Sequence, residues 1–147
     1  MKTHKKHTIA DAVIGAEIKD IDISKLDSDT FSEIEELFNE RSVLCLRGQN
    51  VTEQEYIAFA KRFGNVEELF LKNFAHESYP EILLVSNIKE NGQDIGHADA
   101  GSVWHTDGSY RERPLRASLL YALEVPVRNG IVLGDTTFAS AAAAYDS

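Results

Sequence analysis

Residues Ser102–Pro114 read SVWHTDGSYRERP, and the interpretation of the whole chain works outward from this stretch. His105 and Asp107 stand two positions apart in it, after a tryptophan and before a glycine. In an extended strand, residues two apart project from the same face, with Cα atoms roughly 6.5–7 Å apart. An imidazole and a carboxylate placed in this way can bind one Fe(II), Mn(II) or Zn(II) ion, and one more histidine would complete a facial triad. A solvent-exposed His–Asp pair without a metal is the alternative.

The composition is that of a globular chain of about one domain. The chain has 147 residues, of which 43% are hydrophobic and 27% are charged. Its net charge of −9 repels phosphate backbones, so we expect no nucleic-acid partner. The apolar runs are too short to cross a bilayer and no signal peptide is apparent, so we expect a cytoplasmic location without a membrane partner. The single cysteine, Cys45, excludes an intrachain disulfide, and its apolar context predicts a core thiol.

Three helices are predicted from their N-terminal signals. Thr30 and Glu33 have the spacing of a capping box, and so have Thr52 and Glu55. Each pair precedes apolar residues that recur at helical spacing, so a helix is predicted after each. Ser140 is predicted to cap a third helix, in the alanine-rich stretch at the end of the sequence.

Strands are predicted where apolar residues alternate or run together between turn residues. They fall at 12–24, as two short strands or one with a bulge, and at 42–50, 81–88 and 116–125; residues 127–138 are predicted as a turn and another strand. Asn91-Gly92 predicts a tight turn. Early helices followed by strands predict an α+β fold whose later strands suit a sandwich or jelly roll.

Several motifs together resemble one enzyme family. They are IGAEIKDIDIS at 14–24, RSVLCLRGQNVTEQEYIAFAKRFG at 41–64, VWHTDGSYRERP at 103–114, ASLLYALEVP at 117–126, GDTTFAS at 134–140 and AAYDS at 143–147. In this order, the motifs resemble the taurine dioxygenase / 2,4-dichlorophenoxyacetate dioxygenase (TauD/TfdA) family of Fe(II)- and 2-oxoglutarate-dependent dioxygenases. The resemblance extends over nearly the whole chain.

The resemblance implies a fold, an activity and site residues. The fold would be a partial double-stranded β-helix, a jelly roll of the clavaminate-synthase-like kind, with N-terminal helices. The activity would be hydroxylation of a small organic substrate, with 2-oxoglutarate converted to succinate and CO₂. By position, His105 and Asp107 match the first two iron ligands and the catalytic centre, and Thr136 matches a threonine that contacts 2-oxoglutarate. Trp104 is expected to pack beneath the site, and Ser109 and Tyr110 to face the substrate region.

The chain also departs from the family pattern. The third ligand, a histidine, and the arginine that clamps the cosubstrate belong to the second half of family members and have no counterpart here. Residues 1–147 are therefore expected to form only the N-terminal portion of such a domain. Relatives have two adjacent glycines before the threonine, whereas the residues IVL separate Gly130 from Gly134 here. The extra residues would shift the strand register or form a bulge, so the sequence does not fix the position of Thr136. Leu69 and Gly101 replace the polar residues that bind taurine in relatives, which argues against taurine as the substrate.

Three functional hypotheses follow. The first is a dioxygenase, truncated relative to its family. The second is a catalytically incompetent remnant, or half of a split enzyme, that acts as a binding or assembly partner; it would form a homo-oligomer or bind a complementing C-terminal half. The third is a small cupin-like metal protein in which His97 or His76 supplies the missing ligand.

Overall fold

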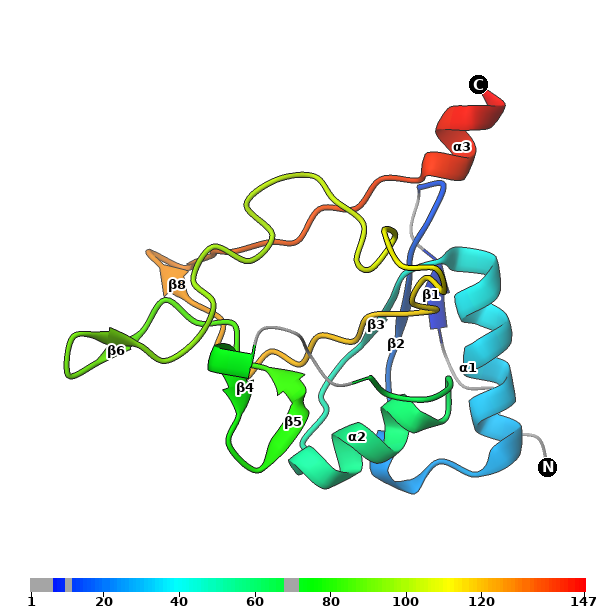
Figure 1. Ribbon diagram of the computed structural model, residues 1–147. Helices are drawn as coiled ribbons and strands as arrows, with labels where there is room; N and C mark the ends of the chain where they lie inside the picture. Colours follow the sequence, from blue (N-terminus) through cyan, green and yellow to red (C-terminus); the bar gives the residue numbers. More distant parts are fainter. Residues whose placement is uncertain (1–6, 10–11, 68–71) are drawn as a thin grey trace. The chain divides into compact units, whose positions relative to one another are not determined.

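A computed structural model describes residues 7–9, 12–67 and 72–147 of the chain (Figure 1). Two compact units divide the chain: one contains residues 1–51 and 120–147, and the other contains residues 52–119. Leu69 lies outside the described residues.

The first unit contains a three-stranded sheet and the helix beside it. Its strands are β1 (His7–Ile9), β2 (Ala16–Ile18) and β3 (Leu44–Leu46), in the order β1-β2-β3. β1 and β2 are antiparallel, whereas β2 and β3 are parallel. A parallel pair needs a crossover connection, and α1 (Ser28–Arg41) lies within that connection and contacts β3 (Figure 1). The core combines Ala16 and Ile18 of the sheet with Phe31 and Ile34 of the helix, all buried.

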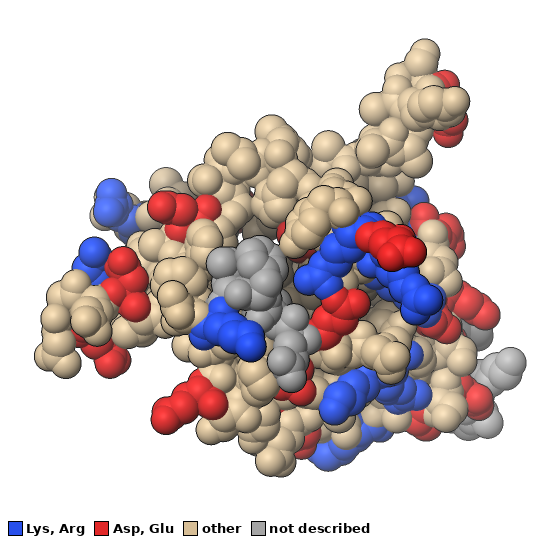
Figure 2. Space-filling view, in the orientation of Figure 1, with Lys and Arg blue, Asp and Glu red and all other residues tan. Residues whose placement is uncertain are grey.

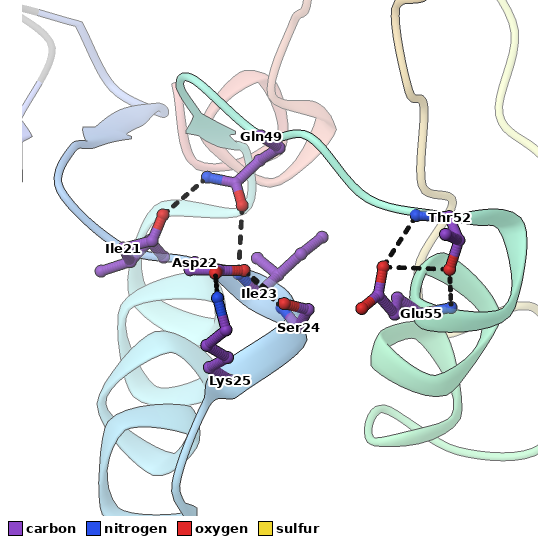
Figure 3. Close-up of polar contacts among 8 residues, drawn as sticks. All are labelled: Ile21, Asp22, Ile23, Ser24, Lys25, Gln49, Thr52 and Glu55. Carbon is purple, nitrogen blue, oxygen red and sulfur yellow. Dashed lines mark hydrogen bonds and ion pairs between the residues drawn. The ribbon is translucent and has the colours of Figure 1, made fainter.

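Two aspartates cap the helical turns of this crossover. Asp22 accepts a hydrogen bond from the Ser24 backbone at 3.0 Å and caps the 3₁₀ helix η1 (Ile23–Lys25) (Figure 3). Asp27 accepts from the Thr30 backbone at 2.7 Å and caps α1. The prediction that Thr30 begins this helix as the cap is therefore wrong, because Asp27 starts the helix earlier and Thr30 is buried in its first turn. A second strand near Ile23 is also wrong, because the Asp22 cap bends that segment into η1.

Gln49 holds the loop after β3 against the segment after β2. Its side-chain amide donates to the Ile21 carbonyl at 3.0 Å, and its side-chain oxygen accepts from the Ile23 backbone at 3.1 Å (Figure 3). The Tyr121 hydroxyl donates to the Gln49 carbonyl at 3.3 Å, which ties the later part of this unit to the earlier part. One side chain thus satisfies backbone groups that the short strands leave unpaired.

The remaining elements of the first unit are a hairpin and a short helix. β8 (Val127–Arg128) and β9 (Ile131–Val132) are antiparallel and enclose Asn129-Gly130. Both turn residues have positive φ, 52° and 77°, as a type I′ turn requires. α3 (Ala141–Asp146) begins after Ser140, whose hydroxyl accepts from the Ala143 backbone at 3.1 Å, so the predicted cap is confirmed.

The second unit begins with α2 (Glu53–Lys61). Thr52 and Glu55 form the predicted capping box: each side chain accepts a hydrogen bond from the backbone N–H of the other residue (Figure 3). The helix buries Ile57 and Phe59, and the Phe59 ring meets the Phe63 ring edge-on at 5.4 Å. The predicted helix is confirmed.

Short strands follow α2 in the second unit. After η2 (Lys72–Phe74), β4 (Ala75–His76) pairs with β5 (Tyr79–Leu83), and β6 (Lys89–Glu90) pairs with β7 (Gln93–Asp94), both antiparallel. The β6–β7 turn is the predicted Asn91-Gly92 turn, again with positive φ at both residues.

The strand predicted at 116–125 does not form, whereas the turn and strand predicted within 127–138 are present as the short β8–β9 hairpin. Residues 117–122 have no helix or strand, although their apolar run predicts a buried strand. The described strands form one sheet of three and three pairs, and not the two facing sheets of a double-stranded β-helix. The physical reason is that an apolar run becomes a buried strand only beside neighbours that pair with its backbone and cover its faces.

The surface mixes charges of both signs. On the face seen in Figure 2, lysine and arginine side chains lie among aspartates and glutamates. Ion pairs of the described residues include Lys19–Glu17 (2.9 Å) and Lys89–Asp94 (3.2 Å). Within the described ranges, no helix is both long enough and apolar enough to cross a membrane.

Candidate metal-binding pair

His105 and Asp107 approach each other in the second unit. The His105 Nε2 and the Asp107 Oδ1 are 3.3 Å apart, and about half of each side chain is exposed. Residues 104–106 have no regular structure, and Asp107 opens a turn that continues to Tyr110. The predicted convergence of the two side chains is therefore present, but a loop that runs into a turn produces it, and not a strand.

A backbone carbonyl orients the imidazole. The His105 Nδ1 lies 2.7 Å from the Val103 carbonyl oxygen, which can only accept a hydrogen bond. Nδ1 must therefore carry a proton, and in the neutral ring the Nε2 lone pair then faces the Asp107 carboxylate. This outer partner is the kind that fixes the tautomer of a metal-binding histidine.

Two electron-pair donors at this distance need a cation between them. A lone pair on Nε2 and a carboxylate oxygen repel each other unless a proton or a metal ion lies between them. Ligand atoms about 2.1 Å from one metal and at right angles are about 3.0 Å apart, close to the separation of this pair. The donor set, one imidazole and one carboxylate, also suits Fe(II). The two residues therefore fit a divalent iron, and a protonated imidazole is the metal-free alternative.

Neither His76 nor His97 completes the pair. In the part of the chain that the structure describes, no group of three or more histidine, cysteine, aspartate or glutamate side chains could hold a metal ion. The His76 Nδ1 accepts a hydrogen bond from the Ser78 backbone at 3.2 Å. The His97 Nδ1 is buried without a hydrogen-bond partner, and its ring lies 5.3 Å from that of Phe74. In the described residues, the structure therefore does not bring either ring to the pair as the third ligand that the cupin-like alternative needs.

Trp104 does not pack beneath the pair. It is 72% exposed, and Tyr110 is 73% exposed. The prediction that Trp104 packs beneath the site is wrong, because residues 104–106 form a loop that leaves the indole exposed. Val103 and Ser109 are exposed as well, so apolar and polar groups are accessible on both sides of the pair.

Tyr56 attaches the chain beyond the site to α2. Its hydroxyl donates to the Leu119 carbonyl at 2.7 Å. Burial raises the pKa of Tyr56 to about 12, so the hydroxyl keeps its proton at neutral pH and remains a donor. The backbone between Asp107 and Leu119 is thereby anchored at its far end.

Thr136 belongs to the first unit and lies between β9 and α3. It is exposed and lies outside any helix or strand. Its hydroxyl can donate a hydrogen bond to a carboxylate, which is the chemistry that the resemblance assigns to it.

A depression in the first unit offers no competing site. It has a volume of about 320 Å³ and is lined by Lys19, Asp20, Ile21, Arg47 and Gly48. Glu17 pairs with Lys19 at 2.9 Å and with Arg47 at 3.6 Å, and these cations hold the pKa of Glu17 below its usual value. Together with Asp20 in the lining, Glu17 balances the two cations, so the depression has no net positive charge that would favour an anion.

Sequence reasoning missed the groups that orient the pair. The Val103 acceptor is a backbone carbonyl, which every residue has, so no residue type marks it. The sequence also does not predict the ion pair between Arg111 and Glu67, because the two residues lie far apart in the chain and no local sequence pattern relates them.

The comparisons with known proteins identify the family. The chain matches the Taurine catabolism dioxygenase TauD, TfdA family over residues 4–147, and it therefore belongs to that family. Among curated proteins it is 36% identical over 147 residues to the alpha-ketoglutarate-dependent 2,4-dichlorophenoxyacetate dioxygenase of Cupriavidus pinatubonensis, covering 92% of this chain and 50% of that protein. It is 38% identical over 143 residues to pentalenolactone F synthase of Streptomyces avermitilis, covering 95% of this chain and 46% of that protein.

A solved structure supports the same relationship. A protein from Burkholderia xenovorans, described as a candidate alpha-ketoglutarate-dependent taurine dioxygenase, aligns with a TM-score of 0.51 and 25% identity. The alignment covers 58% of this chain and 32% of that one. The chain spans about half the length of the curated relatives it matches.

Proposed function

We propose that this chain carries the first part of the active site of an Fe(II)- and 2-oxoglutarate-dependent dioxygenase that hydroxylates a small organic substrate. His105 and Asp107 bind the iron, and Thr136 donates to a carboxylate of 2-oxoglutarate. The observation that carries the proposal is the 3.3 Å approach of Nε2 and Oδ1, with Nδ1 held on the Val103 carbonyl. The whole domain in this proposal is a jelly roll of which residues 1–147 form the N-terminal portion, located in the reducing cytoplasm.

The residues of this chain have separate tasks in that reaction. When bound, the metal supplies the activation of O₂ that is coupled to decarboxylation of 2-oxoglutarate. Val103 keeps the proton on Nδ1, so that His105 offers a lone pair at Nε2. Asp107 adds a negative charge that lowers the net charge of a dication. Thr136 orients the cosubstrate through one hydrogen bond, which is weaker than the bidentate contact of an arginine.

Metal titration is the direct test. Co(II), as a stable stand-in for Fe(II), is titrated into the 147-residue chain under anaerobic conditions. We expect binding in the micromolar range that His105→Ala and Asp107→Ala each abolish, while His76→Ala leaves it unchanged. A surface pair without a metal function predicts no binding, or binding that Asp107→Ala does not change. Succinate release from 2-oxoglutarate, dependent on iron and lowered by Thr136→Ala, then tests the reaction itself.

A complementing polypeptide is part of this proposal. Leu123, Val125 and Val127 alternate along the chain and are 83%, 51% and 60% exposed. Such a row of exposed apolar side chains is a surface that another polypeptide can cover. The occupant we propose is a polypeptide that corresponds to the second half of the relatives, because this chain matches only about half of them. Sedimentation of the chain alone and with the second half of a relative tests this, since a homodimer without the added half would contradict it.

A further inference from the structure

The turn that carries Asp107 closes at Arg111. The Arg111 backbone N–H donates to the Gly108 carbonyl at 3.1 Å, and Gly108 is buried with a φ of 63°. A side chain at Gly108 would start 2.7 Å from the Leu115 Cγ, so the turn packs closely on the chain that follows it. The direction in which the Asp107 carboxylate points is therefore set by a turn that Arg111 ends.

The Arg111 side chain extends from this turn to Glu67. The two form an ion pair, with side chains 25% and 48% exposed. The neighbouring Glu112 and Arg113 are exposed, so Arg111 is the shielded charge of this segment. Glu67 follows α2, and Arg116 also reaches back to this region, donating to the Phe63 carbonyl at 3.3 Å. One residue thus joins the Asp107 turn through its backbone and the chain beyond α2 through its side chain.

We propose that Arg111 is a positioning residue for the His105–Asp107 pair, and that its ion pair with Glu67 fixes the turn that carries Asp107. The metal that the pair would hold rests on the function proposed above. A partly exposed ion pair contributes about 0–1 kcal/mol to stability, too little to explain the contact as a determinant of the fold. A metal ligand, in contrast, must be held within about 0.5 Å of its working position, so a contact of small energy can have a large effect on the site.

The sign of the effect separates positioning from simple electrostatics. Removing the positive charge of Arg111 should tighten the binding of a divalent cation if only long-range charge matters, and removing the negative charge of Glu67 should weaken it. Positioning predicts that both removals weaken binding. Loss of an outer partner of a metal ligand typically costs about 10–100-fold in affinity, and we expect about tenfold here because Arg111 acts through the backbone.

The experiment measures the Co(II) affinity of the full 147-residue chain. The variants are Arg111→Ala, Glu67→Ala and the two together, with Arg113→Ala as the matched control, because it removes the same charge two residues away. We expect each single variant and the double variant to bind Co(II) about tenfold more weakly, without additivity, and Arg113→Ala to stay within about twofold of the parent. The Tm should change little, since the pair contributes little to stability.

Two results would overturn the proposal. Tighter binding by Arg111→Ala would assign Arg111 an electrostatic effect only, and additive losses would show that the two residues act separately. Hydrogen exchange of the metal-free chain supplies a reading that does not depend on the proposed function: Arg111→Ala and Glu67→Ala should speed exchange in peptides covering 107–111, and Arg113→Ala should not. If the parent chain fails to bind Co(II), the proposed function fails, while the exchange rates alone uphold or reject the positioning role.

Discussion

Replacing Gly108 by alanine should destabilise the second unit through two separable effects. The first is conformational: Gly108 has a φ of 63°, where an L-residue costs about 1–2 kcal/mol. The second is steric: the new Cβ would lie 2.7 Å from the Leu115 Cγ and 3.0 Å from its Cδ1. Overpacking of this kind costs about 1–3 kcal/mol, and the lower end applies because Leu115 is 36% exposed and can rotate away.

Gly101 is the matched control for the first effect. It also has a positive φ, 77°, but a Cβ there would meet only the His105 Cε1 at 4.0 Å, an ordinary contact. We therefore expect Gly101→Ala to lower the free energy of unfolding by about 1–2 kcal/mol and Gly108→Ala by about 2–3 kcal/mol. Urea unfolding followed by far-UV circular dichroism is a suitable assay, since α2 lies in the same unit as the two glycines.

A double-mutant cycle tests the steric effect directly. Leu115→Ala removes the two atoms that a Cβ at position 108 would approach, so the double variant should recover about 1 kcal/mol relative to the sum of the single variants. The reasoning is refuted if Gly108→Ala costs no more than Gly101→Ala, or if the cycle shows no coupling beyond about 0.3 kcal/mol. Either result would mean that the turn after Asp107 is not packed on Leu115.

Three further outcomes are expected. Thr52→Ala should lower the free energy of unfolding by about 1 kcal/mol in urea titrations, because it removes the capping box of α2, while the exposed Gln54→Ala should not. Hydrogen bonds from the Lys25 side chain, and next from the Ser24 side chain, lower the pKa of the Asp22 carboxylate from 3.8 to about 2. The folding stability that this carboxylate contributes should therefore be present above pH 3.8 and be lost as the pH falls toward 2. An NMR titration should show that Lys25→Ala raises the pKa of Asp22. Burial raises the pKa of Tyr56 from 10.0 to about 12. The folding stability linked to its protonated hydroxyl should be complete below pH 10 and be lost between pH 10 and 12. In alkaline unfolding experiments, Tyr56→Phe should remove this loss of stability.

Signals confined to a few neighbouring residues were predictable from the sequence. The capping box of Thr52, the Ser140 cap and the Asn91-Gly92 turn each depend on atoms within about one turn of the chain, and all three are present. The wrong cap predicted at Thr30 also concerns residues within one turn of the chain. Asp27 and Thr30 are both good caps, and the sequence alone does not tell which of two nearby caps begins the helix.

Features that need a distant partner were not predictable. The apolar run after Arg116 has the composition of a buried strand, but a strand also requires neighbours that pair with its backbone. The burial predicted for Trp104 is absent for the same reason, since a buried side chain needs a surface of the protein to pack against. The Glu67–Arg111 contact joins residues that no local pattern relates.

The His105–Asp107 pair combines both kinds of information. The spacing of two residues predicts the pair, because residues two apart in a strand project from the same face. In the structure, the same approach of Nε2 and Oδ1 is reached without a strand, through a carbonyl that fixes the imidazole and a turn that directs the carboxylate. The orientation of the two side chains therefore depends on the Val103 carbonyl and on the turn that begins at Asp107, and not on the strand that the sequence predicts. For this reason, variants at Arg111 and Gly108, which leave both candidate ligands intact, test the site more sharply than removal of a ligand does.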